Sequence, residues 1–244
     1  MRIIISPAMK MQKHISQQVT PLFFEKEAKQ LNEQLQKLTL DELKALWNCS
    51  DQLAGKYQKY IADSLTDNLT PAIASFEGIQ YLYLTEHLLS DTGKKFLQEH
   101  VRILSGLYGV LRPYDGVKPY RLEMKNKLNG SLYDFWANKL ADNLYEDNDL
   151  VLNLASNEYA KAIKPYTAGR KFVTVQFLEK HHGKYKTLGV HAKMSRGRLV
   201  HYICENQITD LAGVKQFSDF NYRFSEADST DEKIVFKTDK FETK

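Results

Sequence analysis

The segment Leu104–Met124, LSGLYGVLRPYDGVKPYRLEM, carries two arginines in settings that favour contact with an anion. Arg112 precedes a Pro-Tyr pair and Arg121 follows one. Proline restricts the backbone, and tyrosine offers a flat, amphipathic ring beside the guanidinium group. A guanidinium held in place makes paired hydrogen bonds to phosphate and stacks on nucleobases. Gly106 and Gly109 are three residues apart, which lets a ligand or another stretch of backbone come close.

The same segment also permits a purely structural interpretation. Glu123 is near enough in the sequence to orient one of the arginines, and Asp115 lies three residues after Arg112. A buried network of arginine with either carboxylate would fix a long loop and bind no ligand. The residues alone fit both interpretations.

A second group of polar residues lies in NLASNEYAKAIKP, residues 153–165. The apolar run before it predicts a strand that ends near Ser156, and a helix follows. Backbone N–H groups at such a turn attract anions. Ser156, Tyr159 and Lys161, with Glu158 between them, are residue types that serve in general acid–base catalysis. The alternative is that Ser156 caps the helix and Lys161 lies in solvent.

Three basic residues, Lys193, Arg196 and Arg198, come near the start of a helix predicted over Met194–Gln207. Positive charge at a helix start opposes the helix dipole, so the cluster indicates an anionic partner rather than helix stability. The sequence ITDLAGV follows, and a further helix is predicted over Asp210–Phe217. This pattern resembles the outline of a helix-hairpin-helix element, although the second glycine usual in such a turn is missing.

Metal binding is not predicted. His201 and Cys204 are three apart on that helix and Glu205 follows, but no further ligand is spaced to complete a site. The sequence also lacks the phosphate-binding loops, the nucleophile elbow and the zinc-protease motif that mark several large enzyme classes. We therefore expect neither a metal nor a cofactor.

Apolar patterning predicts the elements that position these residues. Strands are expected at Arg2–Ile5, Ile79–Leu84, Leu150–Leu154, Lys171–Leu178, Tyr185–His191 and Ile234–Phe236. Helices are expected at Pro21–Leu38, Thr39–Cys49, Ser50–Ala62, Asp91–Leu104 and Ser131–Tyr145, besides the two above. Thr39 and Glu42 form a capping box, and Gly183 supplies a hairpin turn. Because the two kinds of element mix without regular alternation, we expect residues 1–244 to form a single α/β domain with a central mixed sheet surrounded by helices.

The composition is that of a globular protein: 244 residues, 43% apolar and 26% charged, with a net charge of +4. This mild positive charge allows a polyanionic partner without requiring one. Cys49 and Cys204 stand alone, as reduced thiols of cytoplasmic proteins do. The opening MRIIISPAMK is too poor in apolar residues for a signal peptide or a membrane span. We expect a cytoplasmic protein with no membrane contact.

Several segments together resemble the YaaA family of bacterial peroxide-stress proteins. They are IIISPA, residues 104–124, YDFW, NLASNEY, SRGRLVHYICEN and DFNYRF, which occur in the family's order. The resemblance implies a family-specific fold with a basic cleft and a helix-hairpin-helix element. It also implies a cytoplasmic DNA-binding protein, with some preference for distorted or branched duplexes, that limits iron-driven oxidative damage. No single reaction is attached to the family as a whole.

The family's signature polar positions fall on Ser6, Ser105, Tyr108, Arg112, Tyr120, Arg121, Glu123, Ser156, Tyr159, Lys161, Lys193 and Arg196. This sequence departs from the family near its start, where Met9 stands in place of a lysine and Lys10 follows. On an extended segment, a shift of one residue turns a side chain to the opposite face. Lys10 therefore replaces the missing lysine only if the segment is irregular.

Two functions are compatible with these residues. The first is binding of double-stranded DNA through its backbone, in a cleft lined by Lys10, Arg112, Arg121, Lys161, Lys193, Arg196 and Arg198. The second is an enzyme acting on a nucleotide, a damaged base or a small anionic metabolite, with Arg121, Glu123, Ser156, Glu158, Tyr159 and Lys161 as candidates. A shallow groove would favour DNA, whereas a deep pocket where these side chains converge would favour a small molecule. Any effect on iron would be indirect, since no ligand cluster is predicted.

Overall fold

Eight strands of the described chain form one mixed sheet. The structure is a computed structural model that describes residues 1–14, 16 and 18–242. The strands of this sheet are β1 (Arg2–Ile5), β5 (Val101–Ser105), β6 (Gly109–Leu111), β8 (Leu150–Asn153), β9 (Lys171–His181), β10 (Lys184–Lys186), β11 (Arg223–Phe224) and β12 (Lys233–Thr238). Their order is β11-β12-β9-β8-β1-β5-β6, and β10 pairs with β9.

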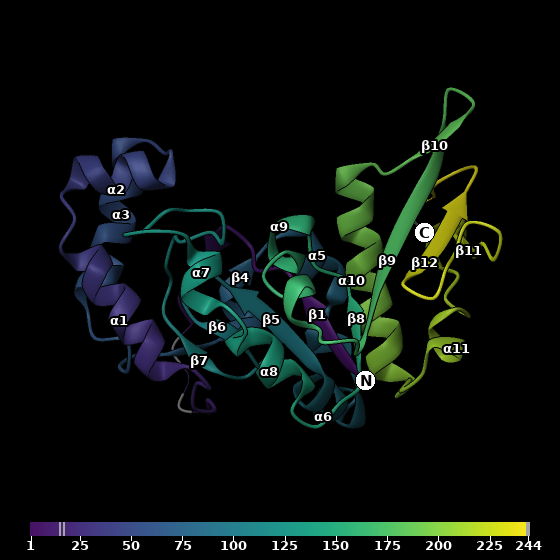
Figure 1. Cartoon of the computed structure of the whole chain (residues 1–244), viewed down its shortest axis with the longest axis horizontal. Coiled ribbons are helices and arrows are strands. Elements are labelled where there is room, and N and C mark those ends of the chain that lie inside the picture. Colours follow the sequence, from purple (N-terminus) through teal and green to yellow (C-terminus); the bar gives the residue numbers. More distant parts are fainter. Residues whose placement is uncertain (15, 17, 243–244) are drawn as a thin grey trace.

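The middle of the sheet is parallel and its margins are antiparallel. Strands β12, β9, β8, β1 and β5 pair in parallel, whereas β11, β10 and β6 pair in the antiparallel direction. Strand β1 lies between β8 and β5, and its residues Ile3, Ile4 and Ile5 are fully buried. An unbroken apolar run is typical of a strand covered on both faces. The predicted mixed sheet surrounded by helices is confirmed (Figure 1).

Two small ribbons connect the sheet to the loops around it. Strand β2 (Lys10–Met11) pairs with β4 (Phe76–Glu77), and β3 (Thr70–Pro71) pairs with β7 (Gly116–Val117). All four strands are antiparallel to their partners and have two residues each. They fix the segment after β1 and the long loop after β6 against the same part of the chain.

The first three helices form an arm beside the sheet. They are α1 (Glu25–Gln36), α2 (Leu40–Trp47) and α3 (Asp51–Ala62). The predicted capping box is confirmed, because Thr39 Oγ1 accepts from the Glu42 N–H and the Glu42 carboxylate accepts from the Thr39 N–H. Ser50 caps α3 through one bond, because its Oγ accepts from the Leu53 N–H. These signals are local, which is why the sequence shows them.

Helix α10 (Gly189–Glu205) packs against the shorter α5 (Ile79–Leu84) and α6 (Asp91–His100). The close approach of α10 to α5 requires Gly197, since a Cβ there would collide with the carbonyl oxygen of Gln80. The predicted strand over Ile79–Leu84 is therefore wrong. Its β-type residues adopt a helix because Gln80 and Leu84, one turn apart, are buried.

Several other elements begin or end at residues different from those predicted. The helix expected over Asp91–Leu104 ends at His100, and the buried strand β5 begins at the next residue. The helix expected over Ser131–Tyr145 is broken at Ala137, which has a φ of +42°, into α7 (Leu132–Trp136) and α8 (Lys139–Tyr145). The second hairpin strand stops at Lys186, and α10 starts five residues before Met194. The remaining short helices are α4 (Ala72–Ser75), α9 (Asn157–Ala160), α11 (Leu211–Val214) and the single turns Glu86–Leu88, Lys164–Tyr166 and Asp219–Asn221.

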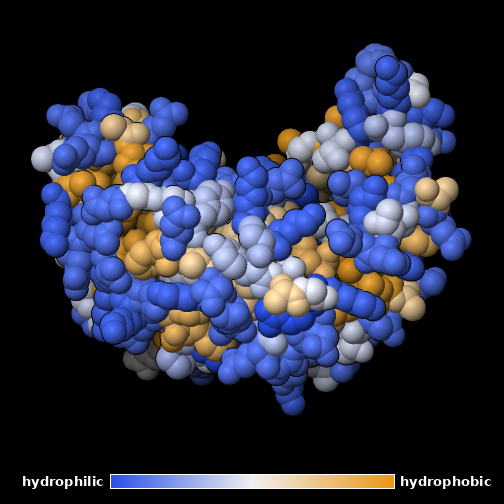
Figure 2. All heavy atoms as spheres, in the orientation of Figure 1, coloured by the Kyte–Doolittle hydropathy of each residue, from blue (hydrophilic) through white to orange (hydrophobic). Residues whose placement is uncertain are grey.

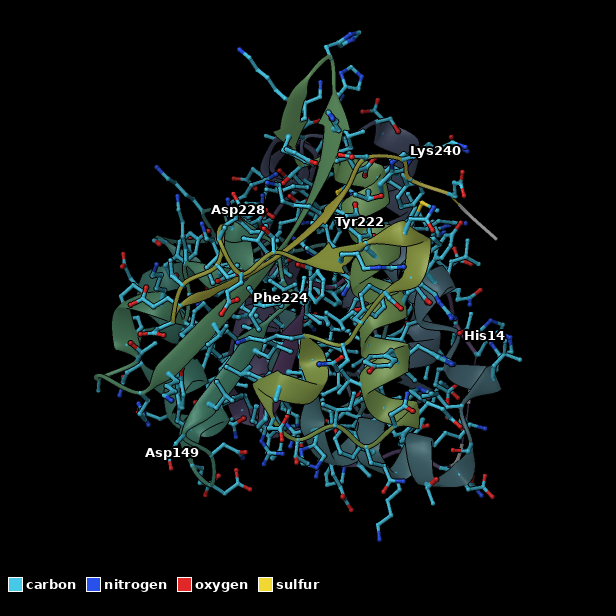
Figure 3. All side chains as sticks on the ribbon, turned by 90° about the vertical axis from the view of Figure 1, so that its right-hand side faces the viewer. His14, Asp149, Tyr222, Phe224, Asp228 and Lys240 are labelled. Carbon is cyan, nitrogen blue, oxygen red and sulfur yellow. The ribbon has the colours of Figure 1, made fainter. Side chains whose placement is uncertain are left out.

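The molecule is hollowed between two arms. Figure 1 shows α1, α2 and α3 on one side and the β9–β10 hairpin on the other, and Figure 2 shows the surface sunken between them. The hairpin turns at His182 and Gly183, which both have positive φ, and the predicted turn at Gly183 is confirmed. Viewed from the side, the hairpin projects beyond the body while β12 runs along β9 (Figure 3). Among the described helices, none combines the length and the apolar character needed to cross a bilayer.

Candidate functional site

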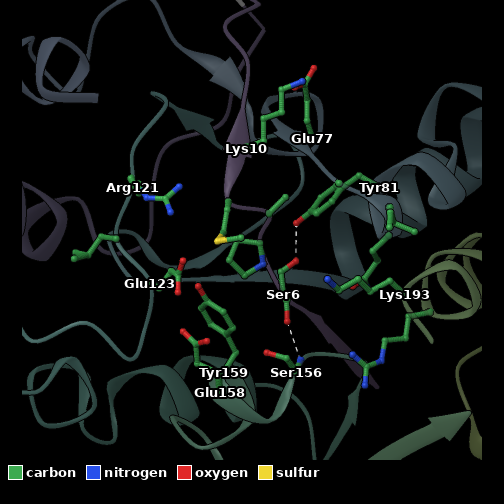
Figure 4. A pocket seen from close by; sticks show the side chains of 18 of the residues that line it. Ser6, Lys10, Glu77, Tyr81, Arg121, Glu123, Ser156, Glu158, Tyr159 and Lys193 are labelled. Carbon is green, nitrogen blue, oxygen red and sulfur yellow. Dashed lines mark hydrogen bonds and ion pairs between the residues drawn. The ribbon is translucent and has the colours of Figure 1, made fainter. Parts of the chain in front are cut away.

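A pocket of about 520 Å³ lies where the turns after β1 and β8 meet. These two strands are parallel neighbours, so their carboxyl ends deliver loops to the same edge of the sheet, where ligands of such folds bind. The pocket is lined by residues from five stretches of the chain: 6–10, 77–81, 120–125, 156–159 and, on α10, Lys193 and Arg196. Figure 4 shows their side chains converging on one space.

The floor of the pocket is a link between the two turns. The backbone N–H of Ser156 donates to Ser6 Oγ at 2.8 Å, and the Tyr81 hydroxyl donates to the Ser6 carbonyl at 2.9 Å. Ser156 is the N-cap residue of α9, yet its own Oγ makes no capping bond. The predicted strand-to-helix turn is thus present, but capping by the Ser156 side chain is wrong. That hydroxyl lines the pocket instead.

Two arginines in the pocket wall have no carboxylate partner within the part of the chain that the structure describes. The Nε atoms of Arg121 and Arg196 are both buried, and neither has a hydrogen-bond partner among the residues described. One terminal nitrogen of Arg121 lies 3.5 Å from the Trp47 carbonyl oxygen. Burial lowers the pKa of the Arg196 guanidinium, with no nearby carboxylate acting against it. The pocket wall thus holds two half-buried guanidinium groups, each with a buried Nε donor that no described residue satisfies.

Other charged groups of the pocket are already paired. Lys10 contacts Glu77 at 2.6 Å, and Lys125 contacts Glu123 at 2.7 Å. Glu158 accepts from the backbone N–H of Lys125 at 3.2 Å. The two ion pairs balance their own charge, whereas Glu158 keeps its negative charge. Arg121, Arg196 and the exposed Lys193 have no carboxylate partner among the described residues, so the pocket carries a surplus of positive charge.

Two tyrosines give the pocket a neutral, hydroxyl-bearing surface. Tyr159 and Tyr120 line it and are buried, and burial raises the pKa of both phenols. The Tyr120 hydroxyl is 2.6 Å from Ser105 Oγ, which also accepts from the Tyr108 backbone N–H. Both phenols therefore stay protonated at neutral pH.

Other predicted residues lie outside the pocket. Arg112 Nε contacts Asp115 at 2.8 Å and Arg198 Nε contacts Asp219 at 2.8 Å, so both guanidinium groups have carboxylate partners. The structural interpretation with Asp115 is therefore confirmed for Arg112. Lys161 is exposed just after α9 and does not line the pocket.

The segment from Leu104 to Met124 does form one wall of the pocket, and its glycines permit the close backbone contact that the sequence predicted. A Cβ on Gly106 would collide with the backbone of Leu122, so the two ends of the segment touch. Gly109 has a φ of +73° and lies against the Trp136 ring. This close contact carries Tyr120, Arg121 and Glu123 to the pocket.

The basic residues of α10 do not cluster at a helix start, so the prediction from the helix dipole is wrong. Helix α10 begins at Gly189, so Arg196 and Arg198 lie in its middle and not at its start. The second element of the expected hairpin motif, α11, has only four residues. The Gly213 N–H in that turn already donates to Asp210 Oδ1 at 2.7 Å.

The two residues considered as metal ligands have other contacts. His201 Nδ1 contacts the Leu84 carbonyl oxygen at 2.9 Å, and Cys204 is fully buried.

The sequence did not predict some of the residues that line the pocket. Glu77, Gln80 and Tyr81 line it but were assigned to a strand or passed over. The pattern Gly-Ile-Gln-Tyr-Leu-Tyr gives no polar signal beyond one glutamine. Only the packing of α5 on α10 brings this segment to the pocket.

Known proteins match this chain over nearly its whole length. A family model described as peroxide stress protein YaaA matches residues 1–228. A UPF0246 protein of Limosilactobacillus reuteri is 45% identical, over 97% of this chain and 99% of its own. UPF0246 proteins of Lactobacillus johnsonii and Lachnoclostridium phytofermentans are each 42% identical, over 97% of this chain and 97% and 96% of their own. The chain belongs to the YaaA family of peroxide stress proteins.

Proposed function

We propose that this protein serves the peroxide-stress role of its family by binding a small anionic molecule in the pocket. The observation that carries the proposal is the pair of buried, unpartnered Nε atoms on Arg121 and Arg196. A buried donor left without a partner costs about 1–3 kcal/mol, and more when it belongs to a charged group. A bound anion would remove that cost.

The size of the pocket supports a small molecule. A volume of about 520 Å³ is within the range of about 300–1,000 Å³ that metabolite and cofactor sites occupy. Its charged, hydroxyl and aromatic side chains converge, which is the arrangement expected of a small-molecule site rather than of an open groove. The enzyme interpretation remains the alternative at this same pocket, and its candidates Ser156, Tyr159, Glu123 and Arg121 all line the pocket.

Thermal unfolding in the presence of small anions tests the proposal. A ligand that binds only the folded state raises the melting temperature as its concentration rises above Kd. We expect glycerol 3-phosphate to stabilise the wild type and Arg198→Gln equally, and Arg196→Gln much less. Arg198 is the matched control, because it is on the same helix but pairs with Asp219 outside the pocket. Equal stabilisation of all three proteins would contradict the proposal.

DNA binding is a second candidate, supported by the hairpin arm. Its exposed residues include Lys180, Lys184 and Lys186, and it borders the hollow seen in Figure 2. Lysines on a projecting strand pair suit contact with DNA phosphates, with an affinity that falls as salt rises. In this proposal the cytoplasmic protein covers DNA and limits iron-driven damage without binding iron itself.

Fluorescence anisotropy with labelled plain, bubble and four-way-junction DNA tests the second candidate. The double variant Lys184→Glu with Lys186→Glu should weaken binding to all three and reduce its salt dependence. The control is Lys94→Glu with Lys95→Glu, an equal charge change on α6. If both double variants lose affinity equally, the hairpin is not the contact surface.

A further inference from the structure

We infer that the ligand of the pocket carries two anionic groups, one bound by Lys193 and Arg196 and the other by Arg121. This inference rests on the proposed function and names the class of molecule that the pocket would take. Figure 4 shows Arg121 on one side of the pocket and Lys193 on the other, with Ser6 between them. The two positive regions therefore lie at opposite ends of one space.

The α10 end of the pocket suits a phosphate group. Lys193 and Arg196 are three residues apart, so their side chains share one face of the helix. Within the described ranges, neither has a carboxylate within 4.0 Å. Lys193 is exposed, and Arg196 is largely desolvated. Two cations on one face, one flexible and one held by burial, fit the charge and geometry of a phosphate dianion.

Arg198, on the same helix, provides a comparison for Arg196. It lies two residues after Arg196 and turns to Asp219, at 2.8 Å, from another part of the chain. On one helix, therefore, the arginine outside the pocket has a counter-ion, and the arginine that lines the pocket has none among the described residues. The difference is what a site reserved for an external anion would show.

The opposite end suits a second anionic group of smaller charge. Arg121 is the surplus cation there, because Lys125 is held by Glu123 at 2.7 Å. The Arg121 contact to the Trp47 carbonyl, at 3.5 Å, is at the limit of a hydrogen bond. A free guanidinium binds a carboxylate or a phosphate through two parallel hydrogen bonds. Either group would satisfy this end.

The rest of the pocket wall is rich in hydroxyl groups, and the one carboxylate there outside the two ion pairs, Glu158, is negative. Ser6, Ser156, Tyr120 and Tyr159 line it, and burial keeps both phenols protonated. Such a surface accepts a short polar linker but offers no further positive charge. The pocket thus selects for charge at both ends of the ligand and not along it.

Isothermal titration calorimetry with three probes tests this inference. Glycerol 3-phosphate has one anionic end, 3-phosphoglycerate has a phosphate and a carboxylate, and fructose 1,6-bisphosphate has two phosphates. We expect at least one two-ended probe to bind the wild type about tenfold more tightly than glycerol 3-phosphate, the effect of one added charge-assisted contact. Arg121→Gln should remove that advantage and leave glycerol 3-phosphate affinity within about twofold.

The variants separate the inference from the proposed function. If two-ended probes bind no more tightly than glycerol 3-phosphate, or if Arg121→Gln weakens all probes equally, the two-ended ligand is wrong while anion binding stands. If no probe binds, or if Arg196→Gln binds all of them as the wild type does, the proposed function falls too. Arg121→Lys, which keeps the charge but not the paired geometry, should retain part of the advantage. Matched circular dichroism spectra and melting temperatures exclude misfolding as the cause.

Discussion

The backbone N–H of Ser156 donates to Ser6 Oγ at 2.8 Å, although 150 residues separate them in the chain. The bond joins the turn after β1 to the turn after β8, at the carboxyl ends of two neighbouring parallel strands. The Tyr81 hydroxyl holds the same serine from the side of α5 through its carbonyl oxygen. The floor of the pocket is therefore a single hydrogen-bonded unit built from three distant segments.

Removing the Ser6 hydroxyl should destabilise the protein. Ser6→Ala leaves the Ser156 N–H without its acceptor, and an unpaired, partly buried donor costs about 1–2 kcal/mol. Urea unfolding followed by circular dichroism measures the change in the free energy of unfolding. The matched control is Ser156→Ala, which keeps the donating N–H and removes an Oγ that makes no capping bond. It should change stability by less than about 0.5 kcal/mol.

Gly197 should not tolerate a side chain. In Gly197→Ala the new Cβ would collide with the backbone of Gln80 and push α10 away from α5. Overpacking of this kind costs about 1–3 kcal/mol, more than the gain in helix propensity. Gly55→Ala in α3 is the control, since nothing lies within 4 Å of its Cβ. Thermal unfolding should show Gly55→Ala to be more stable than wild type by about 0.5–1 kcal/mol and Gly197→Ala to be less stable.

Arg112 should matter for folding and not for the pocket. Asp115 is fully buried and accepts from Arg112 Nε at 2.8 Å, so Arg112→Gln leaves a buried carboxylate without its cation. The expected loss is about 3 kcal/mol at neutral pH, measured by urea unfolding. Burial raises the pKa of Asp115, so this carboxylate takes up a proton at a higher pH than an exposed one does. A protonated Asp115 needs no cation, so the loss should shrink as pH falls. A loss of anion affinity in folded Arg112→Gln would contradict the assignment.

Glu205 should contribute to stability in a pH-dependent way. Its carboxylate accepts from the backbone N–H and the hydroxyl of Ser90, which lowers the pKa of Glu205 below its usual value. A depressed folded pKa gives stability that is present above the unfolded pKa of 4.5 and is lost as pH falls through the folded value. Glu205→Gln should therefore be less stable than wild type at pH 7, and the difference should shrink as pH falls toward 3. A constant difference across this range would contradict the coupling, and Glu226→Gln, on an exposed turn, is the control.

Local signals predicted much of the fold. The three isoleucines of β1 have no alternation because the strand is covered on both faces, and the capping box before α2 is complete within four residues. The segment Ile79–Leu84 was wrongly predicted as a strand. Its β-type residues have only a weak preference for strands, and packing against α10 overrides it. Strand β5 was missed because Arg102 interrupts its apolar run and no glycine or proline separates it from α6.

The sequence predicted the residues of the site better than it predicted which charged residues pair with one another. Arg121, Glu123, Ser156 and Tyr159 do meet in one pocket. Ser156 and Tyr159 follow a strand that the sequence shows, whereas Arg121 and Glu123 lie in a loop that the contact of Gly106 with Leu122 brings to the pocket. The partner of Arg198 is Asp219, 21 residues further on, and no local pattern indicates that contact. Which arginines keep a free charge is thus decided by long-range packing.

The most direct test of anion binding in the pocket is isothermal titration calorimetry of glycerol 3-phosphate with three proteins at one ionic strength. The proteins are the wild type, Arg196→Gln and Arg198→Gln, which differ by one charge on the same helix. We predict that Arg198→Gln binds like the wild type and that Arg196→Gln binds at least about tenfold more weakly, as expected for the loss of a charge-assisted contact. Equal affinity in all three, or no binding by the wild type, would contradict the account.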